Sequence, residues 1–173
     1  NKTITTGGGG AILTNDHELG DAAKHLTSTA KIPHKWEYRH DFVGYNYRMP
    51  NVNAAIGCAQ MEQLNRLLEQ KRCLADNYAN ALKNVFGVSF FREPEFAKSN
   101  YWLNALLLDD VFSERRDELL ERTNNEGIMT RPAWTLMNDL TMFKDCPAMD
   151  LSCAVDIARR LINIPSSPFL AEK

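Results

Sequence analysis

The sequence has 173 residues, of which 44% are hydrophobic and 24% are charged, and its formal net charge is −2. This composition is typical of a globular chain, and no apolar run approaches the roughly 20 residues that span a bilayer. The small net charge provides no broad basic field for nucleic acid or acidic membranes, so neither partner is expected.

The N-terminal part of the chain predicts two short strands followed by a helix. Residues 3–6 and 11–14 have strand composition and flank four consecutive glycines at 7–10, a pattern typical of two strands joined by a turn. Asn15 and Glu18 then have the spacing of a capping box, and apolar residues at helical spacing follow them. We therefore expect a helix that begins after Asn15.

Residues 28–50 lack any hydrophobic periodicity. They contain two prolines, Trp36, three of the five tyrosines and six basic or imidazole side chains. A long irregular segment inside a compact chain is usually functional. We expect this loop to contribute to a binding site.

A long helix follows the loop. Apolar or small residues recur at spacings of three and four from Val52 to Leu82, which predicts one straight or kinked helix with a buried stripe. Asn51, directly after Pro50, is the expected N-cap. A change of composition then places a domain boundary near residue 84.

The remainder predicts a small α+β domain. Strands are expected at 88–91, 101–108 and 128–132, a helix capped by Ser113 and ending near Gly127, and a last helix at 152–162.

The four cysteines, Cys58, Cys73, Cys146 and Cys153, show neither CxxC spacing nor a metal-binding pattern. Reduced thiols in a cytoplasmic protein are therefore favoured over disulfides, and no metal site is expected.

The glycine block taken alone is a weak signal for nucleotide binding. Four glycines can expose backbone N–H groups to a phosphate, but the block matches neither GxGxxG nor GxxxxGK(S/T), and a strand is expected after it. A tight turn is the favoured interpretation.

Several motifs taken in chain order resemble one known family. Lys2 precedes TTGGGG, Gly-Tyr-Asn-Tyr-Arg-Met follows at 44–49, and Asn-Ala-Ala-Ile-Gly at 53–57 is followed by Gln60. This order resembles the DegT/DnrJ/EryC1/StrS family of pyridoxal-phosphate (PLP) sugar aminotransferases. The resemblance is close over residues 1–70 and looser afterwards, including Arg-Pro-Ala-Trp-Thr-Leu-Met at 131–137 and Asn-Ile-Pro-Ser-Ser-Pro at 163–168.

The resemblance implies a mixed α/β to α+β protein of the aspartate-aminotransferase type, fold type I. This chain would be its C-terminal part, beginning one residue before the Schiff-base lysine. Residues 1–84 would hold the end of the large PLP-binding domain and the long connecting helix, and residues 85–173 the small α+β domain. The family works as a homodimer, so a homodimer or higher oligomer is expected, and this half alone is expected to be inactive.

The resemblance also assigns roles to individual residues. Lys2 falls at the Schiff-base position, which makes it the catalytic and cofactor-binding lysine. Asn46 matches the asparagine that reaches the cofactor phosphate of a neighbouring subunit. Tyr47, Arg48 and Trp36 lie in the region that lines the sugar-nucleotide pocket. The implied reaction transfers an amino group from glutamate to a UDP-linked 4-keto-6-deoxy sugar for bacterial surface glycans.

Alternatives remain open for some of these residues. Arg48 could equally form a salt bridge that holds the loop, and packing within the loop is favoured for Trp36. Two positions depart from the family pattern, because Gly8 replaces its usual acidic residue and Asn138 replaces a common histidine.

Two other classes of function also remain open. One is a stand-alone anion-binding module that uses the glycines and the 28–50 loop, and the other is an inert, self-associating fragment. Borohydride trapping of PLP on Lys2 would distinguish the aminotransferase from both.

Overall fold

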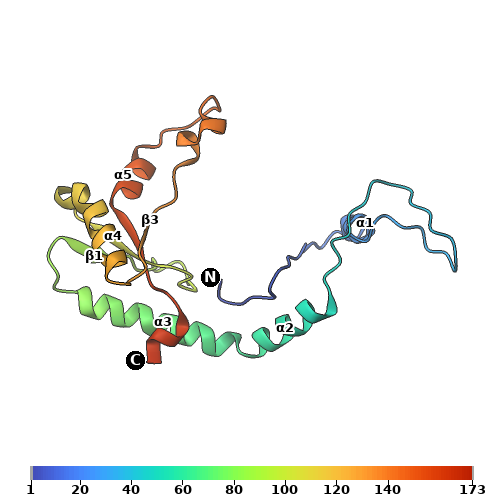
Figure 1. The fold of residues 1–173 in the computed structure, drawn as a ribbon, viewed down its shortest axis with the longest axis horizontal. Helices are drawn as coiled ribbons and strands as arrows, with labels where there is room; N and C mark the ends of the chain where they lie inside the picture. Colours follow the sequence, from blue (N-terminus) through green and yellow to red (C-terminus); the bar gives the residue numbers. More distant parts are fainter. Residues whose placement is uncertain (1, 173) are drawn as a thin grey trace. The chain divides into compact units, whose positions relative to one another are not determined.

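The computed structural model describes residues 2–172, which form two compact units (Figure 1). Unit 1 contains Lys2 and Thr3 together with residues 65–172, and unit 2 contains residues 4–64. The boundary expected near residue 84 falls just after the end of a helix inside unit 1, and it stays a prediction. Within the described chain, no helix is both long enough and apolar enough to cross a membrane.

Unit 1 is built on a four-stranded antiparallel sheet with the order β1-β2-β4-β3. The strands are β1 (Val88–Phe90), β2 (Asn104–Leu108), β3 (Arg131–Pro132) and β4 (Leu161–Ile164). Its helices are α3 (Leu64–Leu82), α4 (Arg116–Asn125) and α5 (Ser152–Arg160), with short 3-10 segments η1 (Asp110–Arg115), η2 (Met137–Asp139), η3 (Thr141–Phe143) and η4 (Pro168–Glu172). Helices α4 and α5 contact β4 and β2, respectively.

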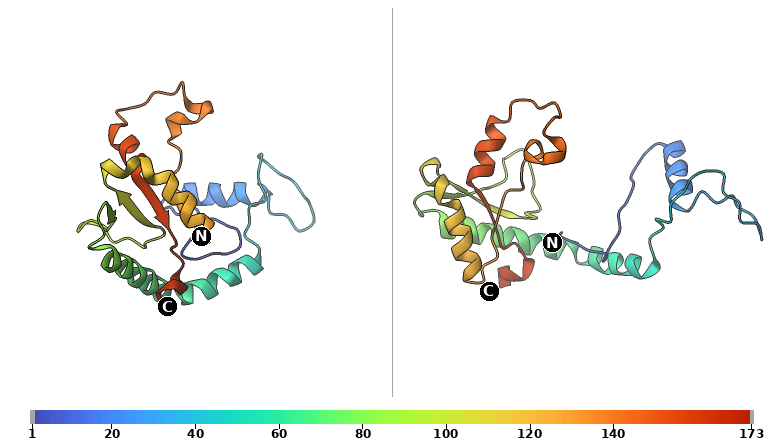
Figure 2. Two further views of the ribbon diagram at one scale, coloured as in Figure 1. Left: turned by 60° about the vertical axis from the view of Figure 1, so that its left-hand side comes forward. Right: turned by 45° about the horizontal axis from the view of Figure 1, so that its top comes forward.

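The central strand β4, drawn as the orange-red arrow in Figure 2, was not expected from the sequence. The last helix was predicted to reach residue 162, but α5 ends at Arg160 and Leu161 begins the strand. The segment Leu-Ile-Asn-Ile is short, so its periodicity does not separate a helix end from a strand. Pairing with β2 on one side and β3 on the other decides in favour of the strand.

The other predicted elements of unit 1 are present with different limits. Strand β1 confirms the strand expected at 88–91, β2 begins at Asn104 rather than at 101, and β3 contains only two residues of the strand expected at 128–132. The prediction that Ser113 caps a helix is wrong. It lies buried within η1, where its hydroxyl accepts a hydrogen bond from Arg159 Nη1 at 2.6 Å.

The core of unit 1 lies on one face of the sheet. Leu108, Ile162 and Ile164 are buried, and Tyr78 from α3 and Leu119 from α4 pack against them. Directly paired residues of neighbouring strands point to the same face, so the register that pairs residue 106 with Ile162 collects these side chains.

Unit 2 contains α1 (His17–Thr27) and α2 (Asn51–Glu62). The cap of α1 is Asp16, not Asn15, because the Asp16 carboxylate accepts a hydrogen bond from the Leu19 N–H at 3.1 Å. The predicted capping box was therefore one residue out of register. Asn51 is likewise not a cap, because it is already helical and Pro50 precedes it without a side-chain cap.

The two strands predicted at 3–6 and 11–14 are wrong, because neither segment is part of a strand in the described chain. An extended segment needs a neighbouring strand to satisfy its backbone groups. Side chains of α2 provide partners instead: Asn53 Nδ2 donates to the Thr6 carbonyl at 2.6 Å, and Gln60 Oε1 accepts from the Thr5 N–H at 3.3 Å.

The long helix expected from Val52 to Leu82 is present as two helices, α2 and α3. Gln63 separates them with φ −103° and ψ 1°, outside helical geometry. Its N–H bonds the Gln60 carbonyl at 3.2 Å, which closes α2 with a short turn. The predicted helix is therefore interrupted at Gln63.

Ile162 should contribute strongly to the stability of the core, because only 1% of its surface is exposed. The change Ile162→Ala should lower the free energy of unfolding by roughly 2–5 kcal/mol, and Ile162→Val by about 0.5–1.5 kcal/mol. Urea denaturation with an unchanged m-value measures both. Val111→Ala is the control, because Val111 is 80% exposed and its truncation should change little.

Candidate functional site

Lys2 and two tryptophans form an aromatic-lined site in unit 1. The Lys2 side chain is exposed, and its Nζ lies 3.2 Å from the centroid of the Trp102 ring. The Trp102 ring also stacks on Trp134, with centroids 5.7 Å apart and planes inclined by 26°. Among the described residues Lys2 has no ion pair, so its primary amine is held by an aromatic surface alone.

A hollow of about 530 Å³ adjoins Trp134. Its lining includes the polar residues Arg131, Asn163, Ser166 and Ser167, together with Trp134, which is 66% exposed. A guanidinium, an amide, hydroxyls and an aromatic ring together can bind a polar ligand that carries rings or negative charge.

The residues of unit 2 assigned by resemblance lie on one loop. The backbone of Asn46 pairs with Ser28 in an antiparallel bridge, and the Tyr47 N–H donates to the Thr27 carbonyl at 2.9 Å. A second bridge joins Lys31 to His40. These bonds hold the start and end of the loop against the end of α1, so they define the position of the Asn46 backbone.

Two imidazoles stabilise the same loop. His25 Nε2 lies 2.6 Å from Asp41 Oδ1, and this hydrogen bond holds the pKa of the Asp41 carboxyl below its ordinary value. His40 Nδ1 lies 2.7 Å from the Thr29 carbonyl oxygen. Both contacts tie the middle of the loop to residues at or just after α1, where Thr29 has a positive φ of 70°.

The predicted substrate-pocket residues are open to solvent. Tyr47 and Trp36 are each 73% exposed; Tyr47 stacks on Tyr45 with centroids 5.4 Å apart, and Trp36 meets His34 edge to face at 4.9 Å. Arg48 is exposed and forms no ion pair within residues 2–172, so the salt bridge considered for it is not found there.

The glycine block forms a bend beside the start of α2. Gly7 has a φ of 77°, the Gly7 N–H donates to Thr5 Oγ1 at 3.1 Å, and Asn53 holds the adjoining carbonyls. Gly8 differs from its neighbours, because a Cβ there would meet no atom within 4 Å and its φ is not positive. The bend therefore has room for the acidic side chain that the family usually carries at this position.

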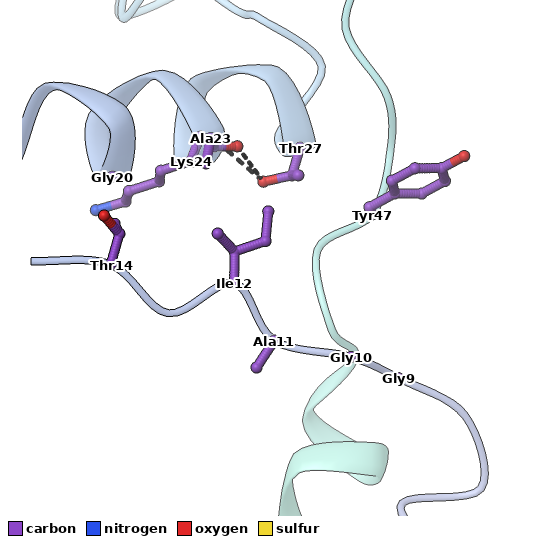
Figure 3. Close-up of a pocket in the computed structure, with 10 residues that line it drawn as sticks. All are labelled: Gly9, Gly10, Ala11, Ile12, Thr14, Gly20, Ala23, Lys24, Thr27 and Tyr47. Atoms are coloured by element: carbon purple, nitrogen blue, oxygen red, sulfur yellow. Dashed lines mark hydrogen bonds between the residues drawn. The ribbon is translucent and has the colours of Figure 1, made fainter. Parts of the chain in front are cut away.

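Unit 2 has a hollow of its own, of about 740 Å³, which lies between the segment 9–14 and α1 (Figure 3). Figure 3 shows Ile12 pointing toward the helix, and Thr27 bonds the Ala23 carbonyl at 2.7 Å on the far wall. Of the site residues named from the sequence, Tyr47 lines this hollow. Ile12 is 66% exposed, so an apolar side chain forms part of this wall.

The sequence analysis missed the two tryptophans around Lys2. Trp102 was placed in a strand, and Trp134 was noted only as part of a family-like segment. Their common signal is the aromatic residue type, which does not by itself separate a packed core residue from a site residue. The position expected to hold a histidine, Asn138, donates to Asp139 Oδ1 at 2.9 Å and shows no contact with this site. The four cysteines are free and exposed, as expected for unpaired thiols.

The chain is similar to several known proteins. GDP-perosamine synthase of Escherichia coli O157:H7 is 36% identical over 173 residues, which are 100% of this chain and 46% of that protein. A Bacillus subtilis strain 168 protein, provisionally named the pyridoxal phosphate-dependent aminotransferase EpsN, is 35% identical over 99% of this chain and 45% of its own length. Other relatives are named transaminases of UDP- and dTDP-linked amino sugars.

A solved structure has the same fold. PseC of Helicobacter pylori, an aminotransferase involved in the biosynthesis of pseudoaminic acid, aligns with a TM-score of 0.87 and 23% identity over 96% of this chain and 46% of that chain. The chain thus has the fold of the matching part of this sugar aminotransferase. The match to the DegT/DnrJ/EryC1/StrS aminotransferase family covers residues 1–173, and the chain belongs to this family. The chain spans about half the length of the curated relatives it matches.

Gly44 is the residue that permits close pairing in the 28–50 loop. A Cβ at this position would lie 2.4 Å from the Thr29 carbonyl carbon, so Gly44→Ala must push the two backbones apart. The amide protons of Tyr45 and Tyr47, which bond carbonyls at the end of α1 at 2.7 and 2.9 Å, should then exchange with solvent at least tenfold faster, the effect of about 1.4 kcal/mol.

Hydrogen exchange followed by NMR tests this prediction. Gly8→Ala is the matched control, because the open space around Gly8 accepts a methyl group. Unchanged protection of Tyr45 and Tyr47 in the Gly44 variant would contradict the pairing described for the loop.

Proposed function

We propose that this chain supplies the reactive lysine and one wall of the substrate pocket of a PLP-dependent aminotransferase that acts on a nucleotide-linked keto sugar. The observation that carries the proposal is the family match over residues 1–173 combined with an exposed Lys2 amine beside an aromatic surface. The amino group would come from an amino acid, for which glutamate is our candidate.

The residues around Lys2 are suited to PLP. A primary amine is the group that bonds an aldehyde, and Lys2 Nζ has no carboxylate partner among residues 2–172 that would restrain it. Bound PLP supplies an electron sink for the carbanion formed at the carbon that loses its proton. The part of this chain is to present Nζ, which can bond the cofactor and, once free, accept or return that proton.

Asn46 is our candidate for a contact with the cofactor phosphate. Its side chain is exposed, while its backbone is pinned by the bridge to Ser28, so the amide is presented from a fixed base. An amide N–H is a donor that suits a phosphate oxygen. In the homodimer that we propose, this phosphate belongs to the neighbouring subunit.

The loop and the names of the relatives support the proposed substrate class. Tyr47, Arg48 and Trp36 offer exposed rings and a guanidinium, which can stack on a base or sugar and pair with a diphosphate. The names of the relatives include GDP-, UDP- and dTDP-linked sugars. The proposal therefore specifies a nucleoside diphosphate keto sugar, and UDP stays a prediction.

Lys2 should carry the cofactor. When the whole protein that contains this sequence is incubated with PLP and reduced with borohydride, peptide mapping should find the label on Lys2. Lys2→Arg keeps the positive charge but cannot form the bond at neutral pH, so it should lose this label and at least 1,000-fold of the transamination rate. Label on other lysines with Lys2 unmodified would reject the assignment.

The 173-residue chain by itself should not transaminate. It matches less than half of the length of the relatives, and we propose that the remaining contacts of the cofactor lie in the part that is not matched. An assay with glutamate and GDP-, UDP- and dTDP-linked keto sugars should show turnover by the whole protein only. Turnover by the isolated chain would show that residues 1–173 hold a complete site.

A further inference from the structure

The contact between Lys2 and Trp102 brings a cation onto the face of an indole. The distance of 3.2 Å from Nζ to the ring centroid is well inside the range of about 6 Å over which such attraction is significant. Trp is also the aromatic residue that attracts cations most strongly. The position of Nζ is thus defined by Trp102, and what matters next is how firmly Trp102 is held.

Trp102 is held from several sides. Its backbone N–H donates to Asn100 Oδ1 at 2.9 Å, and its ring stacks on Trp134. The indole Nε1 is buried without a hydrogen-bond partner among the described residues. An unpaired buried N–H is unfavourable, so the ring is kept in this orientation although its own polar atom gains nothing from it.

The residue before Trp102 has an unusual backbone. Tyr101 has a φ of 45°, in the left-handed region that residues other than glycine rarely adopt. Its N–H bonds Ser99 Oγ at 2.9 Å, and the Arg72 guanidinium lies 5.5 Å from its ring centroid. Arg72 also donates to the Ser99 carbonyl at 2.7 Å, so the strained turn is fixed to α3.

A buried lysine completes this support. Lys71 is only 3% exposed, and its Nζ donates to the Trp102 carbonyl at 3.3 Å and to the Ser166 carbonyl at 2.7 Å. Burial lowers the pKa of Lys71, which reflects the cost of keeping a charge away from water. This cost arises where Lys71 links Trp102 to α3 and to the segment after β4.

We propose that Trp102 is a positioning residue that holds the Lys2 amine whenever it is not bonded to the cofactor, and so favours its release to an incoming amino donor. This inference rests on the proposed function of Lys2. The role of Lys71 and of the turn at Tyr101 is to keep the indole under Nζ. The sequence motifs assign no role to Trp102.

The chemical step that Trp102 would favour is an exchange of amines. With PLP bonded to Lys2, a donor amine would replace the Lys2 nitrogen: the donor nitrogen would take over the double bond to the cofactor, and the bond from Lys2 Nζ would break. The two protons lost by the donor amine would pass to Nζ, which would bind one further proton from solvent to become an ammonium. No electrons are gained or lost overall. The ring contact is available only to the released amine, so it shifts this equilibrium toward release.

The contact itself is tested on the 173-residue chain without any cofactor. In lysine labelled with carbon-13, the ε-methylene protons of Lys2 should resonate upfield, because they lie above an indole ring. Trp102→Leu should remove this shift, and Trp102→Phe should keep part of it. Trp102→Phe also removes the buried unpaired N–H, so it provides a folded variant if the leucine variant does not fold.

Competitive acetylation gives a second readout with a matched control. Lys31 Nζ lies 3.9 Å from the Tyr38 ring centroid, a similar pair in another part of the chain. Trp102→Leu should raise the acetylation rate of Lys2 about fivefold and leave Lys31 unchanged, whereas Tyr38→Leu should affect Lys31 alone. An unchanged upfield shift and an unchanged Lys2 rate in Trp102→Leu would overturn the proposal.

The release step is tested on the whole protein. After PLP is bonded to Lys2, the concentration of glutamate that displaces half of the lysine should be about fivefold higher in Trp102→Leu, with partial recovery in Trp102→Phe. An unchanged midpoint would overturn the release role. If Lys2 of the unaltered protein takes up no PLP, the proposed function fails instead, while the cofactor-free measurements still decide whether Trp102 holds Lys2.

Discussion

The buried ammonium of Lys71 is the interaction on which the arrangement of unit 1 depends. By donating to the carbonyls of Trp102 and Ser166, it joins α3 to the segment before β2 and to the segment after β4. Backbone carbonyls satisfy a buried ammonium only if both segments keep their places. The position of the indole that contacts Lys2 is therefore linked to a residue of α3.

Unit 2 achieves rigidity by another means. Its loop has no strands or helices of its own, and backbone bridges at Ser28 and Lys31, together with the pair of His25 with Asp41, hold it against the end of α1. Aromatic side chains can then remain exposed without the loop losing its course. Such a surface is suited to meeting a ligand or a second chain.

The family could be predicted from the sequence, because short motifs such as Gly-Tyr-Asn-Tyr-Arg-Met identify it without knowledge of spatial neighbours, whereas the roles assigned to Lys2 and Asn46 stay predictions. Local signals were less reliable. Residues 11–14 have strand composition but find no strand to pair with, and residues 161–164 were assigned partly to a helix although they form the centre of a sheet. In both cases the outcome depends on a partner that is distant in sequence.

The sequence by itself determined the family, the order of most helices, the helical course of residues 52–82 and the presence of a lysine next to a glycine turn. These are properties of adjacent residues, of periodicity and of turn chemistry. Only the tertiary structure decided that Trp102 lies under Lys2, that Lys71 is buried, and that β4 separates β2 from β3. The physical reason is that contacts between residues as far apart as Lys2 and Trp102 arise from packing, which no local pattern encodes.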